Sequence, residues 1–374
     1  MPLPFVVIFI EKLEVTILND AYLVLENGGV FKGKPFGYGG EAVGELVFTT
    51  GMTGYLETLS DPVNYGQIVL QTFPLIGNYG VISEDFGAEL GHVKAYVVRD
   101  WCQEPSNFRS EGNLDSFLCE KKIPGIYGID TRELTRLIRE HGTMNAMISK
   151  TAQLSGEQWA KLKGYKITDA VALSMADVPV CCCDEKNGAK FNIAVWNFGT
   201  ADRLAATLSQ YGCRCKVFGY DASADELLSS NSDGVILSGG PGDPAENAKI
   251  IEEIKKLCKK NTPIFAIGLG HQMLAIANGA KTEKLPFGHR GANQAVKEVG
   301  TARAFVTVQN HGYTVKADSL SENAVMNYVN VNDGTCEGIE YKDIPALSIS
   351  FEPIEEIFDK FKSVMEGRCS NASK

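Results

Sequence analysis

The segment Ile264-Phe265-Ala266-Ile267-Gly268-Leu269-Gly270-His271-Gln272 decides how the second half of this 374-residue chain folds. Its first four residues are apolar and predict a buried strand, and a helical pattern begins after Gly268. A strand that enters a sharp turn and then a helix is the layout of a nucleophile elbow, which lifts one side chain above the end of a sheet. The residue at the centre of this turn, Gly268, has no side chain. The sequence therefore predicts the framework of a nucleophilic site without the atom that attacks.

Strands and helices alternate along the chain before this segment. We expect strands at 192–196, 214–218, 234–237 and 264–267, and helices at 201–211, 224–229 and 245–259. Such alternation predicts a parallel, doubly wound sheet. Ligands of these sheets lie beyond the carboxyl ends of the strands. The glycine-rich turn at 238–244 and the elbow both follow strands, so we expect them at one site.

The first half of the chain has a different pattern of short strands and glycine turns. A strand is expected at 21–25 and another at 45–50, and a helix begins at the capping residue Asp130. The periodicity weakens between residues 151 and 190. We therefore expect two α/β domains, residues 1–150 and 191–374, joined by a connection over 151–190.

Composition excludes several classes of function. The chain has 44% hydrophobic and 22% charged residues, which is ordinary for a soluble globular protein. Its formal charge of -10 argues against nucleic-acid binding. The apolar run at 4–10 is too short for a membrane span and lacks the flanks of a signal peptide, so we interpret it as an extra strand or a mis-assigned start of the chain. We expect a cytoplasmic protein that binds neither nucleic acid nor membrane.

The ten cysteines are expected to be reduced thiols, because the chain shows no export signal. Cys181, Cys182 and Cys183 are adjacent and cannot converge on one ion, so we interpret them as part of a solvated linker. No metal or cofactor is predicted. Cys213 and Cys215 face one way in a strand and are expected in the core.

Motifs along the whole chain from about residue 20 resemble the small subunit of carbamoyl phosphate synthetase. They lie at 44–48, 51–55, 61–62, 65–69, 74–80, 128–132 and 144–146 in the first half, and at 238–244, 269–272, 288–293 and 309–313 in the second. The N-terminal motifs are particular to that subunit, whereas the elbow also occurs in other class I glutamine amidotransferases. The resemblance implies a small-subunit-specific α/β domain followed by a doubly wound amidotransferase domain.

The resemblance also implies a function. In that family the small subunit hydrolyses glutamine, and the ammonia passes to a large subunit that makes carbamoyl phosphate from bicarbonate and ATP for pyrimidine and arginine synthesis. The chemistry needs a thiolate, a histidine that takes its proton, an acid that orients the histidine, and an oxyanion hole. The implied partner is a large subunit, and L-glutamine is the implied ligand.

Carried over motif by motif, most of the family's binding positions are present. The oxyanion donors fall on the backbone N–H groups of Gly240 and Leu269. The glutamine-recognising positions are Gly51, Gly240, Gly242, Leu269, Gln272, Asn310, Gly312 and Tyr313.

The catalytic positions have changed. The family's cysteine falls on Gly268, and its His-Pro-Glu motif falls on Glu352-Pro353-Ile354. No shift of alignment supplies the histidine, because the five histidines of the chain end at His311. Asn197 stands where the family usually has aspartate. Glycine adopts positive φ at little cost, so we expect an intact fold that has lost thiol catalysis.

Other groups are weaker candidates for chemistry. Cys258 is expected on the wrong side of the elbow, and Cys336 in a turn at 332–336. Asp243 and Glu352 could bracket a water, but we favour capping or solvated carboxylates, because paired acids are poor amide hydrolases. His271 opens a helix, His311 is expected in a loop, and both are interpreted as structural or pocket-lining.

Three hypotheses about function stay open. The chain is a non-catalytic partner of a large subunit that uses free ammonia, an active glutamine-hydrolysing subunit, or a stand-alone pseudoenzyme that binds glutamine or another amide. The N-terminal motifs favour the first two, and the changed catalytic positions favour the first.

Overall fold

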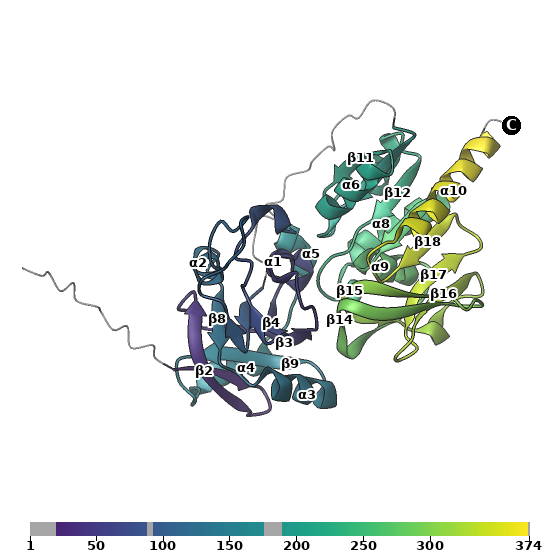
Figure 1. Ribbon diagram of the computed structural model, residues 1–374. Coiled ribbons are helices and arrows are strands. Elements are labelled where there is room, and N and C mark those ends of the chain that lie inside the picture. The colour runs from purple at the N-terminus through teal and green to yellow at the C-terminus, as the bar shows by residue number, and fades with distance from the viewer. Residues whose placement is uncertain (1–19, 88–92, 176–188, 373–374) are drawn as a thin grey trace, which may run out of the picture.

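The computed structural model describes residues 20–87, 93–175 and 189–372. The predictions for residues 4–10 and for Cys181 to Cys183 lie outside these ranges. Two domains lie side by side, the N-terminal one purple to blue and the C-terminal one teal to yellow (Figure 1). Within the described ranges, no helix is both long enough and apolar enough to cross a membrane.

The described N-terminal domain is built on a closed barrel of seven strands in the order β1-β2-β8-β6-β4-β3-β9. The pairs β3–β4, β4–β6 and β6–β8 are parallel, and the remaining pairs are antiparallel. The strands are β1 (Ala21–Leu25), β2 (Val30–Gly37), β3 (Ala42–Thr49), β4 (Gln67–Gln71), β6 (Ala95–Val97), β8 (Pro124–Tyr127) and β9 (Met144–Ser149).

Short helices cover this barrel. The helix α3 (Thr131–His141) begins as predicted, with the Asp130 side chain accepting a hydrogen bond from the N–H of Glu133. Its Leu134 and Ile138 pack on one set of barrel side chains. The opposite set packs on α1 (Tyr55–Ser60) and α2 (Leu114–Glu120), near the small parallel pair β5 (Leu75–Ile76) and β7 (Asp100–Trp101).

The connection between the domains has more regular structure than its weak periodicity indicates. It contains α4 (Gly156–Gly164) and α5 (Ala170–Met175). A capping box at Ser155 starts α4, because the Ser155 hydroxyl accepts from the N–H of Gln158 and the Gln158 side chain accepts from the N–H of Ser155. Local capping stabilises this helix although only Leu162 is fully buried.

The C-terminal domain contains a nine-stranded sheet in the order β11-β10-β12-β13-β18-β17-β15-β14-β16. The predicted parallel sheet is confirmed for the strands β11, β10, β12, β13 and β18. The strands β14 to β17 pair antiparallel. The strands are β10 (Phe191–Trp196), β11 (Cys213–Phe218), β12 (Gly234–Leu237), β13 (Ile264–Ile267), β14 (Thr282–Glu298), β15 (Ala304–Val315), β16 (Ala324–Asn330), β17 (Cys336–Tyr341) and β18 (Ala346–Ile349).

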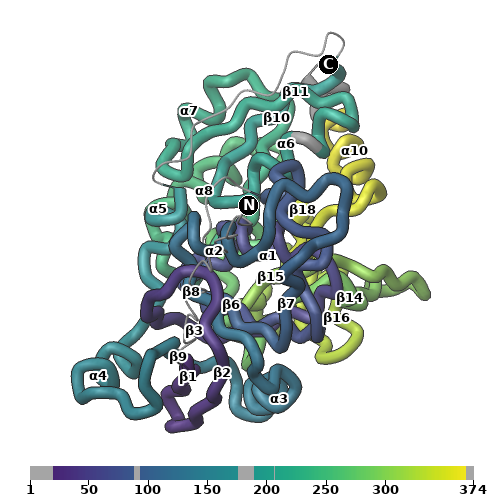
Figure 2. The backbone as a smooth tube through the Cα atoms, turned by 60° about the vertical axis from the view of Figure 1, so that its left-hand side comes forward, coloured from purple at the N-terminus to yellow at the C-terminus, as the bar shows by residue number. Residues whose placement is uncertain are grey.

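Helices cover both faces of the parallel part. On one face lie α7 (Ala224–Ser229), α8 (Ala248–Lys259) and α9 (Leu269–Ala277), and on the other lie α6 (Ala201–Gln210) and α10 (Glu355–Ala372). Figure 2 shows α10 in yellow beside β18. The helix predicted at 245–259 begins later, at Ala248, because a 3₁₀ turn (Pro244–Glu246) precedes it. Cys213 and Cys215 are in the core as predicted.

The two domains contact each other along β3 and β14. The ring of Phe48 stacks on that of Phe287 with centroids 6.1 Å apart, and Lys284 forms an ion pair with Glu45. The N–H of Thr143 donates to the carbonyl of Pro286 at 2.6 Å. These contacts hold β14 against the N-terminal domain.

Candidate functional site

Gly268 has the backbone geometry of a nucleophile elbow. Its φ is 54° and its ψ is -114°, and it precedes the first turn of α9. Its N–H donates to the carbonyl of Ile349 at 2.8 Å, and its own carbonyl accepts from the N–H of Gln272 at 3.2 Å. A Cβ placed on Gly268 would lie 3.4 Å from Cα of Gly239, which is an ordinary contact. The turn therefore has room for a side chain, although its φ suits glycine best.

A cavity of about 410 Å³, here called the elbow cavity, opens beside this turn. It lies between the domains, because Glu45 and Asn145 of the barrel line it together with Gly268. The structure brings seven of the eight expected glutamine-recognising positions to its wall: Gly240, Gly242, Leu269, Gln272, Asn310, Gly312 and Tyr313. The eighth, Gly51, lines an adjoining cavity of about 280 Å³ that also contacts Asn310.

The expected oxyanion donors have no acceptor within the protein. Among the described residues, none accepts a hydrogen bond from the N–H of Gly240 or of Leu269, whereas the neighbouring Gly239 and Gly270 donate to Thr200 and Ser238. Both free groups line the elbow cavity, and Leu269 is the first residue of α9. The positive end of the helix dipole adds to their attraction for an oxygen with negative charge.

Side-chain amides hold part of the wall of the elbow cavity in place. The Gln272 amide donates to the carbonyl of Tyr313 at 2.8 Å. The Asn310 amide donates to Asp61 and to Asn64, both at 3.2 Å. Residues 310–313 are thus tied both to α9 and to the N-terminal domain.

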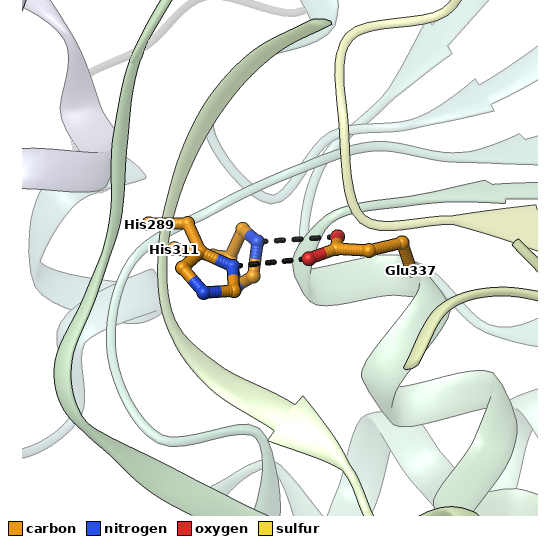
Figure 3. Close-up of side chains that lie close together, drawn as sticks. All are labelled: His289, His311 and Glu337. Carbon is orange, nitrogen blue, oxygen red and sulfur yellow. Dashed lines mark hydrogen bonds and ion pairs between the residues drawn. The ribbon is translucent and has the colours of Figure 1, made fainter. Parts of the chain in front are cut away.

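A buried network of charged side chains supports this wall from behind. Figure 3 shows His289 and His311 pointing toward the carboxylate of Glu337, which is 0% exposed. Nδ1 of His289 lies 3.0 Å from Oε1 of Glu337, and its Nε2 lies 2.8 Å from Oδ2 of Asp333. Nε2 of His311 lies 3.5 Å from Oε2 of Glu337. The network joins β14, β15 and β17.

The charges of this network stabilise one another. Burial lowers the pKa of His289, but hydrogen bonds to Asp333 and Glu337 outweigh burial and raise it to about 9. Burial raises the pKa of Glu337, but attraction to His311 and His289 lowers it to about 2. His289 is therefore a cation and Glu337 an anion at neutral pH.

Two histidines and a carboxylate are also donors that could hold a metal ion, and within the described ranges His289, His311 and Glu337 have donor atoms within 4.8 Å of one another. Here both nitrogens of His289 face carboxylates. A doubly protonated imidazole has no lone pair for a metal. The arrangement therefore fits an ion-pair network better than a metal centre.

On the other side of the turn, Glu352 takes part in an ion-pair chain across the domain boundary. Its carboxylate lies 3.3 Å from Nη1 of Arg203, and Nη2 of Arg203 lies 3.3 Å from Oδ2 of Asp61. Glu352 and Gly268 both line a cavity of about 260 Å³. Burial raises the pKa of Glu352 despite the nearby Arg203. The position that the resemblance assigns to a base thus holds a carboxylate paired with a guanidinium.

Three further candidate residues have structural contacts. Ile354 packs against the apolar cluster under α10, and its carbonyl accepts from the N–H groups of Ile357 and Phe358. The side-chain oxygen of Asn197 accepts from the N–H of Gly199 at 2.8 Å and holds the turn before α6. Asp243 accepts from the N–H of Ala245 at 2.9 Å, so it caps a 3₁₀ turn as we favoured.

No described cysteine lines the cavities beside Gly268. Cys258 lies in α8, and burial raises the pKa of its thiol to about 11. Cys336 is buried, and burial raises its pKa to about 12. The prediction of a turn at Cys336 was wrong, because this residue begins β17. Neither thiol forms a thiolate readily at neutral pH.

His271 and Ser348 form a buried pair under the elbow. Nδ1 of His271 lies 2.8 Å from Oγ of Ser348, and both side chains are fully buried. Burial lowers the pKa of His271 to about 3, so its ring is neutral. A substrate cannot reach this pair, which supports the structural interpretation of His271. His311 belongs to β15 rather than to the predicted loop, because the long antiparallel β14–β15 pair includes it.

Comparisons with known proteins agree with this architecture. Residues 194–353 match the family model described as glutamine amidotransferase class-I, so the sheet and elbow define a domain of that class. Residues 23–148 match the model of the carbamoyl-phosphate synthase small chain, CPSase domain.

Whole-chain relatives extend these matches. A carbamoyl phosphate synthase small chain from Clostridium perfringens is 44% identical over 349 residues, covering 91% of this chain and 98% of the relative. One from Bacillus caldolyticus is 41% identical over 360 residues, covering 92% and 96%. A pyrimidine-specific small chain from Bacillus subtilis is 41% identical over 352 residues, covering 92% and 95%. The chain belongs to the family of carbamoyl phosphate synthase small chains.

Proposed function

We propose that this chain is a carbamoyl phosphate synthase small chain that no longer hydrolyses glutamine and instead partners a large chain that uses free ammonia. The relatives' names support a large-chain partner, and one name includes pyrimidine-specific, which supports a role in supplying pyrimidine precursors. The observation that carries the loss of hydrolysis is Gly268 at the centre of the elbow, where no nucleophilic atom is present.

The groups around Gly268 support this proposal. Amide hydrolysis by this class of site needs a nucleophile and a base within hydrogen-bond reach of each other. Glu352 is paired with Arg203, and no described histidine lines the cavity that Glu352 shares with Gly268. Loss of the nucleophile of a triad costs on the order of 10⁴- to 10⁶-fold in rate.

The cavity wall supports retained binding of L-glutamine. The two free N–H groups, the amide of Gln272 and the Asn310–Tyr313 segment surround a space of about 410 Å³. A ligand held there would not be cleaved, so the site would sense glutamine or stabilise the complex.

A second candidate is an active glutamine-hydrolysing small chain. The family membership over 91% of the chain and the complete cavity wall favour it. It requires a nucleophile other than a thiol at the elbow.

The test is to co-express this chain with the large chain of the same organism and measure carbamoyl phosphate formation. The matched control is the same large chain with a small chain that has an elbow cysteine. We expect a stable complex, synthesis with ammonium chloride, and no glutamate release from glutamine above background. Synthesis driven by glutamine at a rate near that of the control would favour the second candidate. Failure of the two chains to associate would refute the proposed partner.

A further inference from the structure

Arg290 of β14 is a buried guanidinium with few partners. Its side chain is 6% exposed and lines both the elbow cavity and the Gly51 cavity. Nη1 donates to the carbonyl of Phe287 at 2.9 Å. Its Nε is buried and has no hydrogen-bond partner among the described residues, and no described carboxylate forms an ion pair with it.

A buried cation without an anion is costly. Arginine is rarely buried unless it is paired, and the effective cost of removing one ion from water is several kcal/mol. Burial lowers the pKa of Arg290 to about 10, and Glu45 attracts it only at a distance. Arg290 is still charged at neutral pH, so its burial requires an explanation.

The backbone is shaped to hold this guanidinium at the cavity wall. A Cβ on Gly288, whose φ is 71°, would overlap Nη1 of Arg290. A Cβ on Gly312 would lie 3.1 Å from Nη2. Since Gly312 lines the elbow cavity, the end of the Arg290 side chain lies next to that wall.

A purely structural role does not account for these features. The carbonyl of Arg290 accepts from the N–H of Thr50 across the domain boundary, but any residue at this position would supply that carbonyl. Among the described residues, the side chain bonds only to Phe287, three residues earlier in the same strand. Within this part of the chain it bridges neither the two domains nor two strands.

The other charges of the cavity indicate the kind of anion. Glu45, Asp243 and Glu246 line it, and Lys284 is already paired with Glu45. Acidic groups repel a polyanion such as phosphate but attract an ammonium group. Arg290 would attract one carboxylate, in the bidentate geometry that guanidinium favours. A zwitterion fits both features of the cavity, because its carboxylate would pair with Arg290 and its ammonium group with the acidic side chains.

We propose that Arg290 is a specificity residue that binds the α-carboxylate of an amino acid in the elbow cavity. The inference rests on the proposed function, because it takes the ligand to be L-glutamine held without hydrolysis.

The experiment is isothermal titration calorimetry of the full chain with two probes, L-glutamine and its α-amide, in which a carboxamide replaces the α-carboxylate. The wild type is expected to bind L-glutamine about 10- to 100-fold more tightly than the α-amide, as for a hydrogen bond to a charged group. Arg290→Gln should bind the two probes equally. Arg290→Lys should retain part of the preference, because it keeps the charge but not the planar fork.

The matched control is Arg139→Gln. Arg139 lies on α3 with its guanidinium 6.0 Å from the ring of Phe287, outside the elbow cavity, and this variant should keep the full preference. Thermal unfolding without ligand distinguishes a structural role of Arg290 from a role in binding. Removing an unpaired buried charge should leave the unfolding midpoint of Arg290→Gln unchanged or raised.

Three results would overturn the inference: Arg290→Gln that still prefers L-glutamine, wild type that prefers neither probe, or wild type that binds neither. Its failure is separable from that of the proposed function. Binding without dependence on Arg290, and without ammonia release, would refute only the role of Arg290. Binding that depends on Arg290 together with glutamate release would refute only the loss of hydrolysis.

Discussion

The two sides of the elbow differ in how deeply their polar groups are built into the protein. On one side, residues 310–313 rest on the buried network of His289, His311 and Glu337, which joins three strands. On the other side, Glu352 is 52% exposed and pairs with Arg203 in contact with water. The comparison teaches that residues 310–313 depend on buried interactions, whereas Glu352 depends on a partly exposed ion pair.

This difference means that residues 268 and 352 can vary with little effect on the network that supports the cavity wall. Glycine at a φ of 54° avoids the strain that another residue would bear there, so glycine at position 268 is compatible with the fold. A change at Glu337 would leave buried histidines without their anion. The following predictions test this contrast.

The largest effect is expected when a nucleophile and a base are introduced at residues 268 and 352. Gly268→Cys with Glu352→His should raise glutamine hydrolysis about 10²- to 10⁴-fold over Gly268→Cys alone, because a general base contributes that much. The single variant should give a thiol that a glutamine-mimicking chloroketone alkylates slowly. Glutaminase assays and mass spectrometry measure the two outcomes.

Gly268→Ala is the control for this series, because alanine bears the same backbone strain at this φ as cysteine but has no thiol. Ile354→Glu is expected to add little, because Ile354 packs in the apolar cluster under α10 rather than along the cavities beside Gly268. Equal rates for the single and double variants would show that residue 352 cannot reach the elbow.

The second prediction concerns the buried ion pair of His289 and Glu337. His289→Asn should lower the free energy of unfolding by about 3–5 kcal/mol, because it breaks a buried ion pair and leaves Glu337 charged. Denaturant unfolding measures this loss. His141→Asn is the control, since His141 is exposed at the end of α3 and should change stability by less than about 0.5 kcal/mol. Equal effects for both variants would contradict the contrast.

The third prediction is a pH dependence of stability. The pKa of His289 is about 9 in the fold, above its ordinary 6.5, so its contribution is complete below pH 6.5 and is lost as the pH rises to 9. The slope from this one proton cannot exceed about 1.4 kcal/mol per pH unit. Glu337 and Asp333 have pKa values near 2, so their contributions fade only as the pH falls below about 4.5. His289→Asn should flatten the decline between pH 6.5 and 9.

The sequence predicted the parallel half of the sheet and the elbow because both depend on local pattern. Apolar strands such as Ile264–Ile267 are followed directly by turns and helices, so a short window contains the signal. Asn310 and Gly312 are typical of turns, so the local pattern predicts a loop at His311. It lies in β15 because pairing with β14 at His289, a contact distant in sequence, overrides local propensity.

The missed residues of the site are those whose role depends on partners far along the chain. Arg203 meets Asp61 across 142 residues, and nothing near either residue indicates the pair. Arg290 lay inside a motif that was recognised, but its burial was not visible from the sequence. The available signal is that the charged Arg290, together with His289, lies between two glycines, Gly288 and Gly291.

The smallest effect is expected at the exposed ion pair. Glu352→Gln should change the free energy of unfolding by about 0–1 kcal/mol, because both side chains are partly exposed and water and salt screen their attraction. Asp61→Asn should cost more, since Asp61 is 8% exposed, caps the turn at Val63 and holds both Arg203 and Asn310. Urea unfolding of the two variants at low and at 1 M salt measures the difference. If Glu352→Gln proved as costly as Asp61→Asn, the ion pair of Glu352 would be as integral to the fold as the contacts that hold Asn310, and the contrast between the two sides of the elbow would be wrong.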